Sequence, residues 1–267
     1  MSDRGIRIGG RAGFDRLEQL ERHFRSVDFP IELALPWKYK ELWLPIEERI
    51  DEVVEFFRDG EIEILSLHAT QGRITEDSFL SWGRKTLQIA RKLGVGDVTI
   101  HPNHVQREKL SSQVQVLSMI RRMGGDGIFS IETFGGRHRV FTPQDLVDQG
   151  LPMTLDVAHL HKRSLVCDIL RRNHPNIRTL HLSAVGENEH HLPIDGFCID
   201  VVDILVGERW SGNVILEYLP WHHYRVRDDI FALKEHVEKG APVQPMPADD
   251  KFRGRPDRYG YNPDGTN

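Results

Sequence analysis

The chain has 267 residues, of which 39% are hydrophobic and 28% charged, and it contains 14 histidines and a formal net charge of −5 at pH 7. This composition is that of an ordinary globular protein with a sizeable core, and it excludes a chain-wide basic field that would attract nucleic acid. No apolar run approaches the roughly 18 residues of a membrane span. The first five residues lack the apolar core of a signal peptide, and the two cysteines have no CxxC spacing. A reducing cytoplasm is therefore the expected location.

Strand-like and helix-like stretches alternate along the chain. The first half predicts strands at 6–10, 29–36, 63–68 and 98–101, each followed by a helical periodicity at 14–24, 46–57, 78–93 and 107–123. The second half predicts strands at 129–132, 153–156, 177–182 and 214–217, followed by helices that begin at 142, 162, 198 and 229. One helix start carries a specific signal, because Thr142 is a suitable N-cap and Pro143 occupies the first helical position.

Eight strands that alternate with eight helices predict a parallel sheet of βαβ units. At this chain length such units close most naturally into a single (β/α)8 TIM barrel, to which we assign residues 1–240. An open doubly wound sheet is the alternative, but no GxGxxG motif follows the first strand. Residues 241–267 are rich in Pro, Gly, Asp and Arg. They predict an extended C-terminal tail that is mobile or lies across the barrel or a neighbouring subunit of a homo-oligomer.

Six consecutive predicted strands end in side chains of the kinds that bind metals. These residues are His68, His101, Glu132, Asp156, His181 and Glu217. The C-terminal ends of the strands of a TIM barrel meet at one rim, so the six side chains are expected to converge. Carboxylates gathered there repel one another unless a cation neutralises them, and together with imidazoles they form ligand sets for Zn²⁺, Mn²⁺ or Mg²⁺. One such residue alone has a structural explanation more often than a ligand role, but six in succession favour a metal site.

Three further histidines lie close to these strand ends in the sequence. His159 follows Asp156 by three residues, whereas His190 and His191 lie in the loop after the seventh predicted strand. We expect His159 in the catalytic centre. His190 and His191 are candidates for a third metal or for contacts with the substrate, and solvated loop histidines are the alternative interpretation.

Five short motifs surround these residues. They are Ile131-Glu132-Thr133 before a glycine pair, Leu155-Asp156-Val157-Ala158-His159, Leu180-His181-Leu182, His191-Leu192-Pro193-Ile194-Asp195-Gly196, and Ile215-Leu216-Glu217. Over residues 6–240 the chain resembles the xylose-isomerase-like TIM barrel superfamily, which groups sugar and sugar phosphate isomerases and epimerases with endonuclease IV. The resemblance implies that a metal common to both branches is held by Glu132, Asp156, His181 and Glu217.

The endonuclease IV branch is similar in the ends of the third and fourth strands. His68 and the pair His101-Pro102 match its pattern, which implies a second metal beside Glu132. Its third metal uses a His like His159 and an Asp-x-His motif. The aligned triplet in this chain is Asn188-Glu189-His190, so the Asp of that motif is missing.

The isomerase branch is similar in the loops. The pair Gly135-Gly136 and the triplet His191-Leu192-Pro193 match it, whereas Ile194-Asp195-Gly196 departs from the Gly-Glu-Gly that usually follows. The leading hypothesis is therefore a divalent-metal-dependent isomerase or epimerase of a sugar, sugar phosphate or related polyol. The metal would act as a Lewis acid that stabilises an enediolate.

In that hypothesis Glu132 and Glu217 remove and return the proton, and His159 hydrogen-bonds a substrate oxygen. The second hypothesis is an endonuclease IV-like phosphodiesterase that cleaves damaged DNA at abasic sites, with His68 and His101 in a two- or three-metal centre. The third hypothesis is a non-catalytic metal-binding barrel.

Overall fold

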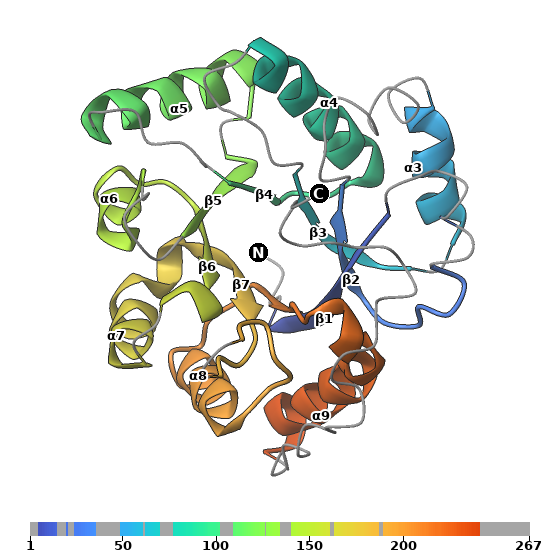
Figure 1. Ribbon diagram of the computed structural model, residues 1–267, viewed down its shortest axis with the longest axis vertical. Helices are drawn as coiled ribbons and strands as arrows, with labels where there is room; N and C mark the ends of the chain where they lie inside the picture. Colours follow the sequence, from blue (N-terminus) through green and yellow to red (C-terminus); the bar gives the residue numbers. More distant parts are fainter. Residues whose placement is uncertain are drawn as a thin grey trace.

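A computed structural model describes residues 5–14, 20, 24–35, 49–60, 62–69, 77–101, 109–125, 127–133, 140–160, 163–186 and 189–240. Within these ranges eight parallel strands form a closed barrel in the order β1 to β8, and β1 pairs with β8 to close it. Figure 1 looks along the barrel, with the helices in a ring outside the strands. The predicted (β/α)8 TIM barrel is confirmed. The tail at 241–267 and the glycine pair at 135–136 lie outside the described residues.

The strands follow the predicted positions. They are β1 (Arg7–Gly13), β2 (Ile31–Ala34), β3 (Ile64–His68), β4 (Val98–Ile100), β5 (Phe129–Thr133), β6 (Met153–Asp156), β7 (Ile177–Leu182) and β8 (Asn213–Leu216). The largest difference concerns β1, which the apolar pattern ended at Gly10 and which continues to Gly13 because it keeps pairing with β2. This extension brings Arg11 into the barrel wall.

The helices cover the outside of the barrel (Figure 1). Those described are α3 (Ile50–Asp59), α4 (Asp77–Leu93), α5 (Lys109–Met123), α6 (Pro143–Asp148), α7 (Arg163–Asn173), α8 (Gly196–Gly207) and α9 (Val226–Lys239), with 3₁₀ turns η2 (Ala158–Leu160), η3 (His174–Asn176) and η4 (Pro220–Arg225). The predicted helix at 14–24 lies mostly outside the described ranges. None of the helices within them combines the length and apolar character that a bilayer crossing requires.

The predicted start of α6 is confirmed in atomic detail. The Thr142 hydroxyl accepts a hydrogen bond from the Asp145 backbone N–H at 3.2 Å, and the Asp145 carboxylate accepts one from the Thr142 N–H at 2.7 Å. This reciprocal capping box satisfies two backbone donors that a helix start otherwise leaves without partners. It fixes where the chain turns after β5 and so supports the rim of the barrel.

The barrel interior is polar. Successive residues of a strand face opposite sides of the wall, and hydrogen bonds between strands that are not neighbours must cross the interior. Two such bonds join Thr99 to Thr154 at 2.9 Å and Thr179 to Asp97 at 2.5 Å. Apolar side chains of the same strands, such as Leu155 on β6, are buried in the hydrophobic core. At the C-terminal ends of the strands, the positions that face this polar interior are occupied by ionisable side chains such as Asp156 and His181.

Candidate metal centre at the barrel rim

The six strand-end residues predicted to converge lie at one rim. His68, Asp156 and His181 lie at the ends of β3, β6 and β7, and the other three lie at or directly after the ends of β4, β5 and β8. Asp156 is opposite His181 in the register of β6 and β7. Five of the six are buried, and the side chain of Glu217 is 15% exposed. Closure of the parallel barrel therefore brings the six residues to one rim, as the sequence predicted.

Four of these residues form one cluster, which we call the central group: Glu132, Asp156, His181 and Glu217. One potential ligand atom from each lies within 4.8 Å of all the others. His181 Nδ1 is 3.0 Å from Glu217 Oε2 and 3.4 Å from Glu132 Oε1. Three carboxylates and one imidazole at this spacing are a ligand set for a divalent cation.

The central group contains buried polar atoms without hydrogen-bond partners. These atoms are Asp156 Oδ2, both ring nitrogens of His181 and Glu217 Oε2. The other Asp156 oxygen accepts hydrogen bonds from the Ala158 N–H at 2.7 Å and the His159 N–H at 3.3 Å. A buried polar atom without a hydrogen bond is unfavourable by about 1–3 kcal/mol. Because the residues that carry these atoms lie within ligand distance of one another, they fit a cation bound between them. The residues present thus fit a divalent metal.

A second cluster, the lateral group, consists of His68, His101 and Glu132. His68 Nε2 lies 2.8 Å from His101 Nε2 and 3.3 Å from Glu132 Oε2, and His101 Nε2 contacts the same carboxylate oxygen. His68 Nδ1 donates a hydrogen bond to the Ala69 carbonyl oxygen at 3.1 Å. In a neutral imidazole this bond leaves the lone pair on Nε2, which faces the group.

Glu132 belongs to both groups through different oxygens. Its Oε1 faces His181 in the central group, and its Oε2 faces His68 and His101 in the lateral group. A carboxylate with its two oxygens directed to separate ligand clusters has the geometry of a bridge between two cations. This arrangement makes Glu132 the residue on which both groups depend.

The surroundings of the three carboxyls of the central group shift their pKa values. Burial alone would raise the pKa of Glu132, but the neighbouring His101 and His181 hold it well below the usual range. Burial would likewise raise the pKa of Glu217, but Arg11, His191 and His181 hold it well below the usual range. Burial raises the pKa of Asp156.

The surroundings of His68 favour its neutral form. Burial, Arg11 and His101 together lower the pKa of His68 to about 4. At neutral pH this ring is therefore neutral, the form of histidine that can bind a metal.

The three further histidines separate in the structure. His159 and His191 join Asp156 in a third cluster of potential ligand atoms, with the two rings edge to face at 5.4 Å. His159 Nε2 is 3.4 Å from Asp156 Oδ2. His190 is exposed and belongs to none of the clusters found among the described residues, while Asn188 lies outside them. The proposed third site thus has His159 and His191 in place but not His190.

Two charged residues that contact the central group were absent from the predicted set. Glu32, in the middle of β2, is completely buried, and its Oε1 lies 3.0 Å from His181 Nε2. Arg11, near the end of β1, forms an ion pair with Glu217. The available signal for Glu32 was a charged residue inside the apolar run Ile31-Glu32-Leu33. For Arg11 no signal existed, because the predicted strand ended before it.

Comparisons with known proteins identify relatives of the fold. No family model and no curated protein match the sequence. Among solved structures, a D-tagatose 3-epimerase-like protein aligns with a TM-score of 0.66 and 15% identity over 87% of this chain and 97% of that chain. Endonuclease IV from Thermus thermophilus aligns with a TM-score of 0.59 and 15% identity over 86% of this chain and 99% of that chain.

A third structure, D-allulose 3-epimerase from Methylomonas sp. in complex with D-allulose, has a TM-score of 0.56 and 12% identity over 81% of this chain and 85% of that chain. These similarities, all at low sequence identity, show a shared (β/α)8 barrel fold. They support the resemblance expected from the motifs at the level of the fold. In this barrel, buried clusters of histidines and carboxylates consistent with divalent metal binding lie at the C-terminal ends of the strands.

Proposed function

We propose that the protein is a divalent-metal-dependent isomerase or epimerase of a small sugar, sugar phosphate or related polyol. The observation that carries the proposal is the central group, in which Asp156, His181 and Glu217 lie within ligand distance of one another and each has a buried polar atom without a hydrogen bond. The similarity of the fold to a D-tagatose 3-epimerase-like protein and to a D-allulose 3-epimerase supports the substrate class.

The positions of the two glutamates of the central group suit the exchange of a proton with a substrate. Glu132 comes from β5 and Glu217 follows β8, so they approach from different sides of the rim. The pKa of each lies well below the usual range, so both are ionised at neutral pH, the form that accepts a proton. When bound, a divalent cation supplies a Lewis acid that polarises a carbonyl and makes the adjacent C–H more acidic.

In this proposal His159 orients the substrate. Its side chain is 29% exposed, whereas the neighbouring Asp156 is completely buried. A partly exposed imidazole at the edge of a buried ligand cluster can donate a hydrogen bond to a hydroxyl or carbonyl oxygen that enters from solvent. His159 would therefore fix the orientation of the substrate, while Glu132 and Glu217 transfer the proton.

The test is hydrogen exchange from substrate carbon. Purified protein with Mn²⁺ or Zn²⁺ is incubated in D₂O with tetroses, pentoses, hexoses and their phosphates, and deuterium incorporation is measured by NMR. At least one sugar is expected to exchange, and Glu132→Gln and Glu217→Gln are each expected to reduce the rate by at least about 10²-fold. Asp97→Asn alters another buried carboxylate away from the rim and is the matched control. Absence of exchange across the panel would overturn the proposal.

A second candidate function is favoured by the lateral group. Two imidazole nitrogens and one carboxylate oxygen that meet beside the central group suit a second cation, and pairs of cations bridged by a carboxylate are typical of phosphodiester hydrolysis. The similarity of the fold to an endonuclease IV supports this function. The substrate would then be damaged DNA cleaved at an abasic site.

Metal content separates the two functions. One ion per chain, unchanged in His68→Gln, favours the isomerase, whereas two ions that fall to one in His68→Gln favour the phosphodiesterase. Nicking of abasic-site DNA by the wild type with Zn²⁺ or Mn²⁺ is the activity measurement for the second function. Bound metal with neither exchange nor nicking would leave a non-catalytic metal-binding barrel.

A further inference from the structure

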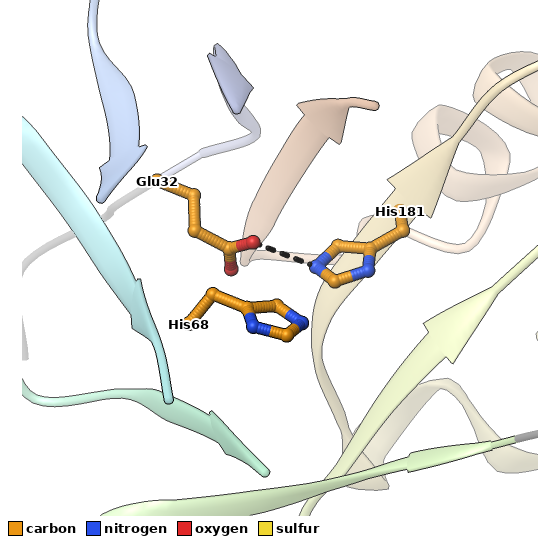
Figure 2. A group of neighbouring side chains, drawn as sticks. All are labelled: Glu32, His68 and His181. Atoms are coloured by element: carbon orange, nitrogen blue, oxygen red, sulfur yellow. Dashed lines mark ion pairs between the residues drawn. The ribbon is translucent and has the colours of Figure 1, made fainter. Parts of the chain in front are cut away.

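Glu32 is a buried charge beneath the proposed metal centre. It lies in the middle of β2 with no exposed surface, and Figure 2 shows its carboxylate directed across the barrel at His181 on β7. The strands β2 and β7 are not neighbours in the sheet. The contact therefore spans the interior and is not a consequence of strand pairing.

Both oxygens of the Glu32 carboxylate are engaged. Oε1 pairs with His181 Nε2 at 3.0 Å, and Oε2 accepts hydrogen bonds from the hydroxyls of Ser66 at 2.8 Å and Thr99 at 3.5 Å. The two hydroxyls come from β3 and β4 and hold the carboxylate oxygen that does not face His181. Because the two hydroxyls hold Oε2, the Glu32 carboxylate is oriented with Oε1 toward the His181 imidazole.

The two nitrogens of His181 face different partners. Nε2 faces Glu32, and Nδ1 faces the carboxylates of Glu132 and Glu217 in the central group. A carboxylate accepts but cannot donate, so when a cation on the Nδ1 side leaves His181 with a single proton, Glu32 requires that proton on Nε2. The Nδ1 lone pair is then directed at the centre, as metal binding requires.

We infer that Glu32 is a positioning residue that holds His181 in the Nε2–H tautomer and in the orientation that directs Nδ1 to the metal. The inference rests on the proposed metal site but not on the reaction that occurs there. A carboxylate behind a histidine ligand also raises the basicity of that ligand, and loss of such a partner typically weakens metal affinity by about 10–100-fold. Glu32 therefore contributes to affinity without touching metal or substrate.

His68 packs against the His181 ring that Glu32 is inferred to orient. Its ring stacks on that of His181, with ring centroids 5.7 Å apart and planes inclined by 26°, and Figure 2 shows both imidazoles beside the Glu32 side chain. Although Glu32, His68 and His181 could be taken as a metal cluster of their own, His68 Nδ1 is bonded to a backbone carbonyl and its Nε2 serves the lateral group.

The experiment is a metal titration of the full-length, metal-free protein by calorimetry, with Zn²⁺ and with Mn²⁺ and without substrate. Glu32→Gln keeps the shape of the side chain and removes its charge, and it is expected to weaken the tight site by about 10–100-fold. Asp97→Asn is the matched control, because Asp97 is also a buried carboxylate but contacts the hydroxyls of Ser130 and Thr179 instead of a histidine. This control is expected to bind with wild-type affinity.

A second measurement reports the tautomer directly. In the Zn²⁺-loaded wild type the side-chain ¹⁵N spectrum is expected to show His181 as the Nε2–H form, with the signal assigned through His181→Gln. Ser66→Ala leaves Glu32 charged but removes one hydroxyl that orients it, and a smaller loss of about threefold to tenfold is expected. This variant serves if Glu32→Gln does not fold.

Each outcome has a distinct meaning. Affinity within twofold of wild type in Glu32→Gln, equal weakening in Asp97→Asn, or an Nδ1–H form of His181 would overturn the role of Glu32 and leave the metal site standing. A wild type that takes up neither cation would overturn both the metal site and this inference.

Discussion

Arg11 and Glu217 form a nearly buried ion pair at the junction where β1 closes the barrel against β8. Their side chains are 14% and 15% exposed, and the preceding residues Gly10 and Leu216 are opposite each other in the strand register. The pair places a fixed positive charge beside the carboxylates of the central group. It leaves Glu217 Oε2 directed at that group while Oε1 is held by the guanidinium.

Removal of this guanidinium is expected to destabilise the metal-free protein in a pH-dependent way. The pKa of Glu217 lies well below its usual value of 4.5 because Arg11, His191 and His181 together outweigh the effect of burial. A depressed pKa contributes stability that is present above the usual value and is lost as the pH falls through the folded-state value. Arg11→Gln should therefore lose about 3 kcal/mol at pH 7 and progressively less below about pH 4.

Urea denaturation of EDTA-treated protein across this pH range measures the effect. Arg7→Gln is the control on the same strand, because the Arg7–Glu63 pair at 3.9 Å is 35% and 58% exposed and is expected to contribute less than about 1 kcal/mol. Equal losses in the two variants would contradict the prediction.

Divalent cations are expected to stabilise the fold. A ligand at about 100 times its dissociation constant adds about 2.7 kcal/mol to the free energy of unfolding, which corresponds to ~5–10 °C in Tm for a protein of this size. We expect Zn²⁺ or Mn²⁺ to raise the Tm of the EDTA-treated wild type by this amount in differential scanning fluorimetry. Asp156→Asn removes one charge of the central group and should abolish the increase. An increase of the same size in this variant would place the cation elsewhere.

Asp97 is expected to make the protein less stable as the pH rises. Burial raises its pKa above the usual 3.8, although hydrogen bonds from Ser130 and Thr179 oppose this shift. A raised carboxyl pKa means that the folded state binds the proton more readily, so stability falls as the pH rises from about 3.8 through the folded-state value.

Asp97→Asn should therefore stabilise the protein more at pH 7 than near pH 3, where the Asp97 carboxyl is protonated in the wild type. Thermal unfolding at both pH values measures this difference, and a variant whose Tm follows that of the wild type at both would refute the explanation.

The capping box at α6 is expected to contribute to stability on its own. Thr142→Ala removes the hydroxyl that accepts from the Asp145 N–H, and loss of such a cap lowers the free energy of unfolding by about 1 kcal/mol. The Tm should fall by ~2–4 °C, whereas Thr142→Ser keeps the hydroxyl and should retain most of the wild-type Tm. A Thr142→Ala protein as stable as Thr142→Ser would show that the cap is not needed.

Several features could be predicted because their causes are local in the chain. The period of the apolar residues distinguishes strand from helix, and the regular alternation of the two restricts the topology to a parallel barrel. In such a barrel every strand end lies at the same rim, so His68 and Glu217 could be brought together although they lie far apart in the sequence. The start of α6 was predictable because its signal lies within Thr142 and Pro143.

Other features could not be read from local patterns alone. A charged residue inside an apolar run marks Glu32 as unusual, but the run does not show which side chain on another strand it contacts. The two oxygens of Glu132 face different groups of side chains. Which group each oxygen faces depends on the angles between the strands. The exclusion of His190 and the inclusion of His191 depend on the path of one loop.

The amino-acid order by itself determined the barrel and the list of side chains carried to its rim, because strand periodicity and strand ends are properties of neighbouring residues. Only the tertiary structure decided which atoms meet, which of them remain without partners, and which buried charge stands behind His181. Those relationships are distances across the barrel between β2, β5, β7 and β8, and such distances exist only once the sheet has closed.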